Sequence, residues 1–171
     1  YDTLGRKCKI LKEHYDHWLA FQDRLTDNAK FNELANIIDS TDESVVVFSQ
    51  HSVVLKALKA RFPQAELITG KCSRSQRRTA IDNFQQKKST VFLLSTRCAS
   101  VGITLTSGSH MVFMEPLLDE TVVKQAIGRV ARTGQLQSVH IHTLVTKGTI
   151  DETFLALRSE YDQLRDTQNR K

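Results

Sequence analysis

The sequence has few cysteines, and their spacing excludes a domain built on disulfides. Its 171 residues contain three cysteines, Cys8, Cys72 and Cys98, and no C-x-x-C pair. Neither a disulfide framework nor a structural zinc site is indicated, so we expect a reducing compartment. No stretch approaches about 18 consecutive apolar residues, and no charged start precedes an apolar run at the N-terminus. We therefore expect a soluble chain that is not secreted and contacts no membrane.

Signatures that would bind a nucleotide without help are also missing. The chain has no G-x-x-x-x-G-K-[ST] loop for phosphates and no paired acidic segment for the Mg²⁺ of a nucleoside triphosphate. No G-x-G-x-x-G follows any predicted strand, which argues against a simple Rossmann-like oxidoreductase. We therefore expect that the chain alone does not hydrolyse ATP.

Length and charge limit the number of domains and the kind of binding partner. The chain is long enough for one domain with a real core, and 40% of its residues are hydrophobic. The formal net charge of +5 favours an anionic partner without identifying it. The chain begins with Tyr1 rather than Met, so we expect a piece of a longer protein.

Apolar runs alternate with amphipathic segments along most of the chain. Strands are predicted at 45–48, 65–69, 91–94, 111–114 and 139–145. Helices are predicted at 51–61, 74–86 and 119–131, with a further helix starting near Thr149. Ser73-x-x-Gln76 and Thr149-x-x-Glu152 read as capping boxes at two helix starts. Three of the strand runs lack polar alternation, which is typical of strands covered on both faces.

This order predicts an α/β fold in which helices cover both faces of a mainly parallel sheet. Residues 1–40 look different, with helical stretches at 7–24 and 29–39 separated by a turn signal at 26–28. We interpret 1–40 as a helical lead-in packed on the sheet, and 41–171 as the main domain.

Polar side chains and cations follow the predicted strands. Because ligands bind at the carboxyl ends of parallel strands, these residues form the first candidate site. They are Ser49, Gln50, Gly70, Lys71, Ser95, Thr96 and Arg97. The segment 71–88 adds Arg74, Arg77, Arg78 and Lys87 against the single acid Asp82. Hydroxyls, amides and cations of this kind contact a phosphodiester backbone without reading bases. A solvated, basic helix face is the alternative interpretation.

A second candidate site lies in the segment 125–135. Gln125, Arg129 and Arg132 are spaced by four and three residues, so on a helix they share one face. An apolar stripe lies about 120° around from them, at about 100° per residue. Two arginines held side by side can donate forked hydrogen bonds to phosphate oxygens, which is the chemistry of an arginine finger. A solvated surface helix with spaced charges is the alternative.

Two further elements carry weaker signals. Gly102 lies in a loop of small residues, where it permits a close backbone approach or a positive φ. Glu115-Pro116 follows the 111–114 run, and we interpret it as a strand terminator, although the carboxylate can also orient a neighbouring loop.

These elements together resemble the second RecA-like lobe of superfamily-two helicases, in the Swi/Snf-type DNA translocase branch. The run 45–50 is similar to motif IV of that family, and 69–78 to the loop and helix after it. Residues 91–97 with 102–106 are similar to motif V, and 125–135 to motif VI. The resemblance runs from about Thr26 to about Glu160.

The resemblance implies a RecA-like lobe that grips the backbone of double-stranded DNA and completes an ATP site on an absent first lobe, which would hold most of the ATP and Mg²⁺. Arg129 and Arg132 would reach the γ-phosphate, Gln125 would order the site and Gly102 would lie near the nucleotide. The DNA strand would lie on Ser49, Gln50, Lys71, Arg74, Ser95, Thr96 and Arg97. An arginine finger contributes roughly a thousand- to a hundred-thousandfold in rate.

Some residues depart from the family pattern. Residues 99–102 hold one glycine where two or more are usual, and Ala131 stands where many members have histidine. Residues 114–117 are similar to the SHPRH branch, whose members carry a RING ubiquitin ligase. The parent would act in the nucleus on nucleosomes, other DNA-bound proteins or ubiquitin machinery. A non-catalytic nucleic-acid or protein scaffold, and an RNA helicase lobe, remain the alternatives.

Overall fold

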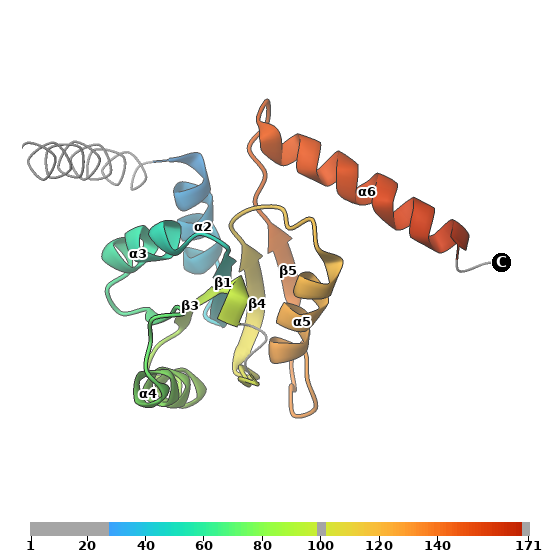
Figure 1. Ribbon diagram of the computed structural model, residues 1–171. Helices are drawn as coiled ribbons and strands as arrows, with labels where there is room; N and C mark the ends of the chain where they lie inside the picture. Colours follow the sequence, from blue (N-terminus) through green and yellow to red (C-terminus); the bar gives the residue numbers. More distant parts are fainter. Residues whose placement is uncertain (1–27, 99–101, 169–171) are drawn as a thin grey trace, which may run out of the picture.

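The computed structural model describes residues 28–98 and 102–168 (Figure 1). In these residues five strands alternate with α-helices, except between the third and fourth strands, where the described part of the connection holds a 3₁₀ turn. The strands are β1 Ser44–Ser49, β2 Glu66–Ile68, β3 Val91–Ser95, β4 Gly108–Phe113 and β5 His140–Thr143. The helices are α2 Ala29–Asp39, α3 Ser52–Arg61, α4 Arg74–Gln85, α5 Glu120–Val130 and α6 Ile150–Gln168, with a 3₁₀ turn η1 at Thr96–Cys98. The predicted order of strands and helices is confirmed.

The five strands form one parallel sheet in the order β2-β3-β1-β4-β5. The strands with uninterrupted apolar runs, β1, β3 and β4, occupy its centre, where a strand needs cover on both faces. Val45 is paired with Val91 and Ser49 with Ser95, so β1 and β3 end level with each other. All carboxyl ends therefore meet at one edge of the sheet, which we call the carboxyl edge, and the opposite edge is the amino edge.

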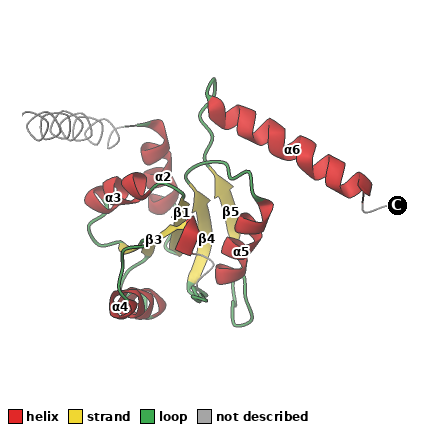
Figure 2. Cartoon of the chain, viewed as in Figure 1, coloured by secondary structure: helices red, strands yellow, loops and turns green. Residues whose placement is uncertain are grey.

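Helices cover both faces of the sheet, as predicted (Figure 2). On one face Val46 and Phe48 of β1 pack in a core with Phe84 of α4 and Ala126 of α5. On the other face the alternate β1 residues Val45 and Val47 pack in a core that includes residues of α2 and α3. The fold is an α/β, RecA-like lobe.

Helix α2 belongs to this packing. Its Phe31 and Leu34 are buried in the second core, and the Asn28 side chain caps the helix by accepting from the N–H of Phe31 at 3.0 Å. The predicted helix at 29–39 and its packing on the sheet are thus confirmed. The predicted helix at 7–24 lies outside the described residues, and the division of the chain at residue 40 stays a prediction.

The C-terminal elements are less covered than the centre of the sheet. β5 is the outermost strand of the sheet, and its residues His140, Ile141 and Thr143 are exposed. Figure 1 shows α6 extending away from the sheet beyond its first turns. Among the described residues, no helix is long and apolar enough to cross a bilayer.

Two predicted capping boxes have different outcomes. At α4 the box is confirmed, because Ser73 Oγ accepts from the Gln76 N–H at 3.2 Å and Gln76 Oε1 accepts from the Ser73 N–H at 2.8 Å. At α6 the predicted pairing is wrong by one residue on each side. Thr149 Oγ1 accepts from the Asp151 N–H at 3.3 Å, and the Glu152 carboxylate accepts from Gly148 at 3.0 Å. Gly148 adopts a φ of +69°, and this turn brings its N–H rather than that of Thr149 to the carboxylate.

Candidate functional site

Three hydroxyl residues of the first candidate site lie beneath the carboxyl edge. Ser49, Ser95 and Thr96 expose 0%, 6% and 5% of their surface, respectively. They end or follow central strands whose two faces are both covered, so their side chains share that cover. The Ser49 hydroxyl is also engaged, since it donates to Glu115 Oε2 at 3.1 Å and accepts from the His51 N–H at 3.0 Å. The expectation that these three hydroxyls line the surface is therefore corrected.

The other members of the set are exposed on the carboxyl side of the sheet. These are Gln50, Lys71, Arg74 and Arg97. Gln50, Lys71 and Arg97 follow β1, β2 and β3, and Arg74 begins the helix after β2, as the parallel topology requires. The exposed surface at this edge is consequently one of cations and an amide rather than of hydroxyls.

Glu115 fixes the loop that carries Gln50. Its carboxylate accepts from the Ser49 hydroxyl and from the backbone N–H of Gln50. β4 does end before Glu115, but the side chain is more than a plain terminator: it joins the end of β4 to the end of β1, which is the alternative in which the carboxylate orients a neighbouring loop. The signal available in the sequence was the acid immediately after the apolar run, at the edge where loops meet.

The loop between β2 and α4 presents two of the exposed cations. A backbone hydrogen bond from Cys72 N–H to Thr69 O, at 3.1 Å, closes the loop, and Lys71 lies exposed within it. Arg74 is the first residue of α4. Helix N-termini carry a partial positive charge, which adds to that of the two side chains. The arrangement can bind an anion of the phosphate type.

The arginines of the second candidate site lie at the amino edge. Helix α5 begins with the Asp119 cap at the carboxyl edge and returns across the sheet, so its C-terminal end, with Arg129, reaches the opposite edge. The helix ends at Val130. Arg132 is therefore in the turn that follows, which corrects the expectation that one helical face carries Gln125, Arg129 and Arg132.

Contacts join these arginines to the loop before β4. Arg132 Nη1 donates to Thr104 Oγ1 at 3.1 Å, and the Leu105 N–H donates to Arg129 O at 2.8 Å. Arg132 is exposed and Arg129 is half-buried. Gly102 is exposed as well, and among the described residues, its chain neighbours aside, no atom lies within 4 Å of the point where a Cβ would stand. Thr104 was not identified from the sequence, although it lies in the motif V segment.

One loop links the two edges. The segment between β3 and β4 leaves the carboxyl edge at Thr96 and Arg97 and reaches the amino edge at Thr104 and Leu105. Gln85, at the end of α4, holds its far end by donating to Thr104 O at 2.8 Å and accepting from the Ser107 N–H at 3.1 Å. The two described parts of this segment, 96–98 and 102–107, therefore lie toward opposite edges of the sheet.

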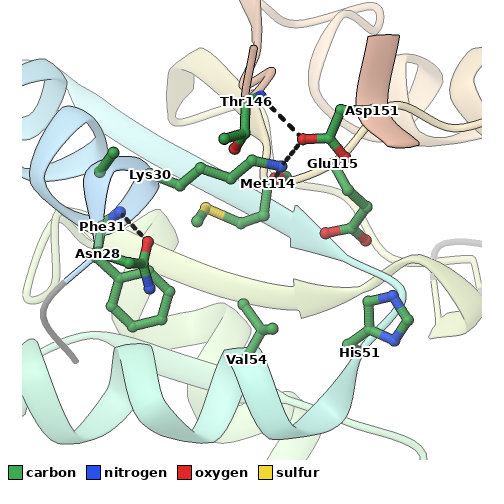
Figure 3. A pocket seen from close by; sticks show the side chains of 10 residues that line it. Asn28, Lys30, Phe31, His51, Val54, Met114, Glu115, Thr146 and Asp151 are labelled. Atoms are coloured by element: carbon green, nitrogen blue, oxygen red, sulfur yellow. Dashed lines mark hydrogen bonds and ion pairs between the residues drawn. The ribbon is translucent and has the colours of Figure 1, made fainter. Parts of the chain in front are cut away.

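A pocket of about 540 Å³ opens beside the carboxyl edge, between α2, α3 and the start of α6 (Figure 3). An ion pair at its wall joins Lys30 Nζ to Asp151 Oδ2 at 2.6 Å, and Lys30 also donates to Met114 O at 2.8 Å. Burial raises the pKa of Asp151, but hydrogen bonds from Lys30 and Thr146 outweigh it and hold the pKa below its ordinary value. The pair joins the first and last helices of the described chain.

A histidine cluster occupies the β4–β5 side of the sheet. The His110 ring stacks on His140 and His142, with ring centroids 4.9 and 5.6 Å away, and its Nε2 lies 3.4 Å from Glu43. Burial lowers the pKa of His110, and the neighbouring histidines add to this while Glu43 opposes it. Within the described ranges no group of three or more ligating side chains is placed to hold a metal ion.

Comparison with known proteins identifies the lobe. The family pattern described as the helicase conserved C-terminal domain matches residues 29–134. The chain belongs to this family. This domain is 36% identical over 157 residues to a Xenopus laevis SWI/SNF-related matrix-associated actin-dependent regulator of chromatin, subfamily A-like protein 1, covering 86% of the chain and 16% of that protein. It is also 29% identical over 175 residues to the putative ATP-dependent helicase/translocase YwqA of Bacillus subtilis, covering 95% of the chain and 19% of that protein.

A solved structure extends the likeness to three dimensions. This helicase C-terminal domain is similar to the C-terminal part of the Fun30 ATPase domain, with a TM-score of 0.74, 26% identity, and coverage of 80% of this chain and 46% of that one. The chain spans less than a fifth of the length of the two curated relatives named above. The domain is thus similar to one part of a SWI/SNF-related protein and of a putative ATP-dependent helicase/translocase, both of them several times its length.

Proposed function

We propose that this domain is the second lobe of an ATP-driven translocase on double-stranded DNA. Its carboxyl-edge cations would bind the phosphodiester backbone, while Arg129 and Arg132 would reach the γ-phosphate of ATP held with Mg²⁺ by a first lobe of the parent chain. One observation supports this most: Lys71, Arg74 and Arg97 are exposed at the carboxyl edge and Arg132 is exposed at the amino edge of the same sheet.

The DNA-facing half of the proposal rests on Gln50, Lys71, Arg74 and Arg97. Exposed cations and amides on adjacent loops match a backbone that offers a phosphate at regular intervals. Ser49, Ser95 and Thr96 are buried beneath these loops and would hold the loops in place without contacting DNA.

The nucleotide-facing half rests on Arg132, Arg129, Gln125 and Gly102. A guanidinium held by a hydrogen bond to Thr104, yet exposed, keeps donors for a phosphate oxygen on another lobe. The open space at Gly102 leaves room for a ligand to approach the backbone. Because the phosphate loop and Mg²⁺ ligands are absent from this sequence, the isolated chain would show no DNA-stimulated ATP hydrolysis; measurable turnover would contradict the lobe assignment.

A salt titration of DNA binding tests the DNA-facing half. The double variant Lys71→Gln/Arg74→Gln removes two cations from the carboxyl edge, and Lys87→Gln/Lys88→Gln removes two exposed cations from the far end of α4. If the first pair contacts phosphates, its loss lowers the slope of log affinity against log salt by about 2. The control pair leaves the slope unchanged. Equal slopes for the two double variants would show that the basic segment is only a solvated face.

Two other functions share this fold. A scaffold lobe predicts DNA binding that is weak or flat with salt, because no ordered phosphate contacts would form. An RNA helicase lobe predicts that single-stranded RNA stimulates ATP hydrolysis by the parent more strongly than double-stranded DNA does. The exposed Arg132 favours the catalytic proposal, since a scaffold gains nothing from that side chain.

The finer parts of the proposal concern the parent. Nuclear location and action on nucleosomes, repair intermediates or ubiquitin machinery would follow from a chromatin role. The residues Met114–Leu117 support a relation to the SHPRH branch, and a RING domain elsewhere in the parent would be its test; the 171 residues of this chain hold no cysteine–histidine zinc pattern.

A further inference from the structure

Arg77 points inward while its neighbours in α4 point outward. Its Nε donates to Cys72 O at 3.1 Å, and its Nη2 lies 3.5 Å from both Thr69 O and Gly70 O. The side chain is half-buried, unlike Arg74 and Arg78 on either side of it, which are exposed. One guanidinium thus meets three carbonyl groups of a single loop.

These contacts determine the shape of the loop 69–72. The carbonyls that Arg77 gathers converge on its guanidinium, while the Lys71 side chain lies exposed to solvent. Cys72 adds a second tie, because its Sγ accepts from the Thr69 N–H at 3.3 Å and its own N–H donates to Thr69 O. Without the guanidinium, the carbonyls of Gly70 and Cys72 would lose this donor and Thr69 O would keep only the Cys72 N–H, so the loop would open to water.

The planar fork of arginine is needed for this task. It presents several donors in fixed directions, whereas a lysine ammonium is a compact charge on a flexible stem. Since Arg77 directly follows the capping box, about one turn after the N-cap Ser73, it also ties the loop to the body of α4.

We propose that Arg77 is a positioning residue, which holds Lys71 and Arg74 ready for a phosphodiester backbone without contacting DNA itself. This inference rests on the proposed DNA-binding function. A preordered loop loses less conformational freedom when it binds, so its affinity is higher than that of the same charges on an open loop. We expect Arg77→Gln to weaken binding to double-stranded DNA by about five- to tenfold more than loss of one charge alone.

Arg78→Gln is the matched control. It makes the same change in charge one residue away, where the side chain is exposed and lies 3.8 Å from Asp82. Arg77→Lys keeps the charge but not the fork, and we expect an intermediate affinity. If Arg77→Gln and Arg78→Gln weaken binding equally, the positioning role is overturned.

The Lys71→Gln/Arg74→Gln background separates this inference from the proposed function. If Arg77 acts through those two residues, Arg77→Gln costs no more than Arg78→Gln once they are gone. A full additional loss in that background would mean that Arg77 contacts DNA directly, which overturns the inference alone. If Lys71→Gln/Arg74→Gln itself leaves affinity unchanged, the proposed DNA site fails instead.

Amide hydrogen exchange without DNA supplies a readout that does not depend on the function. We expect the Cys72 amide, which is bonded to Thr69 O, to exchange at least tenfold faster in Arg77→Gln and unchanged in Arg78→Gln. Unchanged protection in Arg77→Gln would refute the claim that this side chain orders the loop. If Arg77→Gln does not fold, Arg77→Lys takes its place in both measurements, and wild-type affinity and protection in that variant would likewise refute it.

Discussion

Replacement of Asp151 by asparagine should loosen α6 from the rest of the domain. The carboxylate accepts from Lys30 at 2.6 Å and from the Thr146 N–H at 2.9 Å, and the two charged side chains are only 20% and 12% exposed. Breaking a buried pair costs about 3–5 kcal/mol, and a single charged hydrogen bond contributes about 1.5–3 kcal/mol. Because this pair is partly exposed, we expect a loss of about 2–3 kcal/mol in the free energy of unfolding. For a domain of this size that lowers Tm by about 4–12 °C.

Thermal unfolding followed by circular dichroism at pH 7 provides the assay. Lys30→Met and the double variant complete a cycle that isolates the coupling between the two side chains. Lys124→Met is the control, because it removes an i,i+4 helix pair in which the Lys124 side chain is exposed, and loss of such a pair should cost only about 0.3–0.5 kcal/mol. If Asp151→Asn lowers Tm no more than Lys124→Met does, the ion pair does not stabilise the packing of α6.

The pH dependence of the same comparison has a definite sign. The folded-state pKa of Asp151 lies below its ordinary value of 3.8, so its stabilisation is fully present above that value. As the pH falls through the folded-state pKa, the stabilisation disappears. The difference in Tm between the wild type and Asp151→Asn should therefore be constant near neutral pH and shrink in acid. A difference that grows in acid would refute the assignment.

Two further predictions follow from the sheet. His110 has a lowered folded-state pKa, so between that pKa and 6.5 the unfolded chain binds more protons than the folded chain, and the free energy of unfolding falls as the pH drops. The variant His110→Gln should therefore show a smaller decrease in Tm between pH 7.5 and 5.5 than the wild type. An equal decrease in Tm would contradict this. Gly108→Ala should cost about 1–3 kcal/mol in chemical denaturation, because the new Cβ would stand 2.6 Å from Val46 Cγ2 in a filled core; an unchanged free energy of unfolding would show that Val46 can move aside without cost.

The fold was largely predictable because its signals are local. The apolar runs of β1, β3 and β4 are covered on both faces, and their lack of alternation reflects this directly. The Ser73 capping box likewise depends on residues three apart. Such features need no knowledge of long-range pairing.

The site was less predictable because burial and register depend on the whole sheet. Ser49 and Ser95 look like surface donors in the sequence, but they pair with each other in central strands and are buried. The Lys30–Asp151 pair joins residues far apart in the chain, and no local pattern marks it. The end of α5 at Val130 is also a tertiary outcome, because the carbonyl of Arg129 bonds to Leu105 of another segment.

The most direct test of the central claim replaces Arg132 by alanine in the parent protein. We expect DNA-stimulated ATP hydrolysis to fall by about a thousandfold or more, while the affinity for double-stranded DNA stays within about twofold. Arg78→Ala, which removes an exposed arginine on another helix, should retain hydrolysis. Normal hydrolysis in Arg132→Ala would contradict the claim that this side chain serves a nucleotide on a partner lobe.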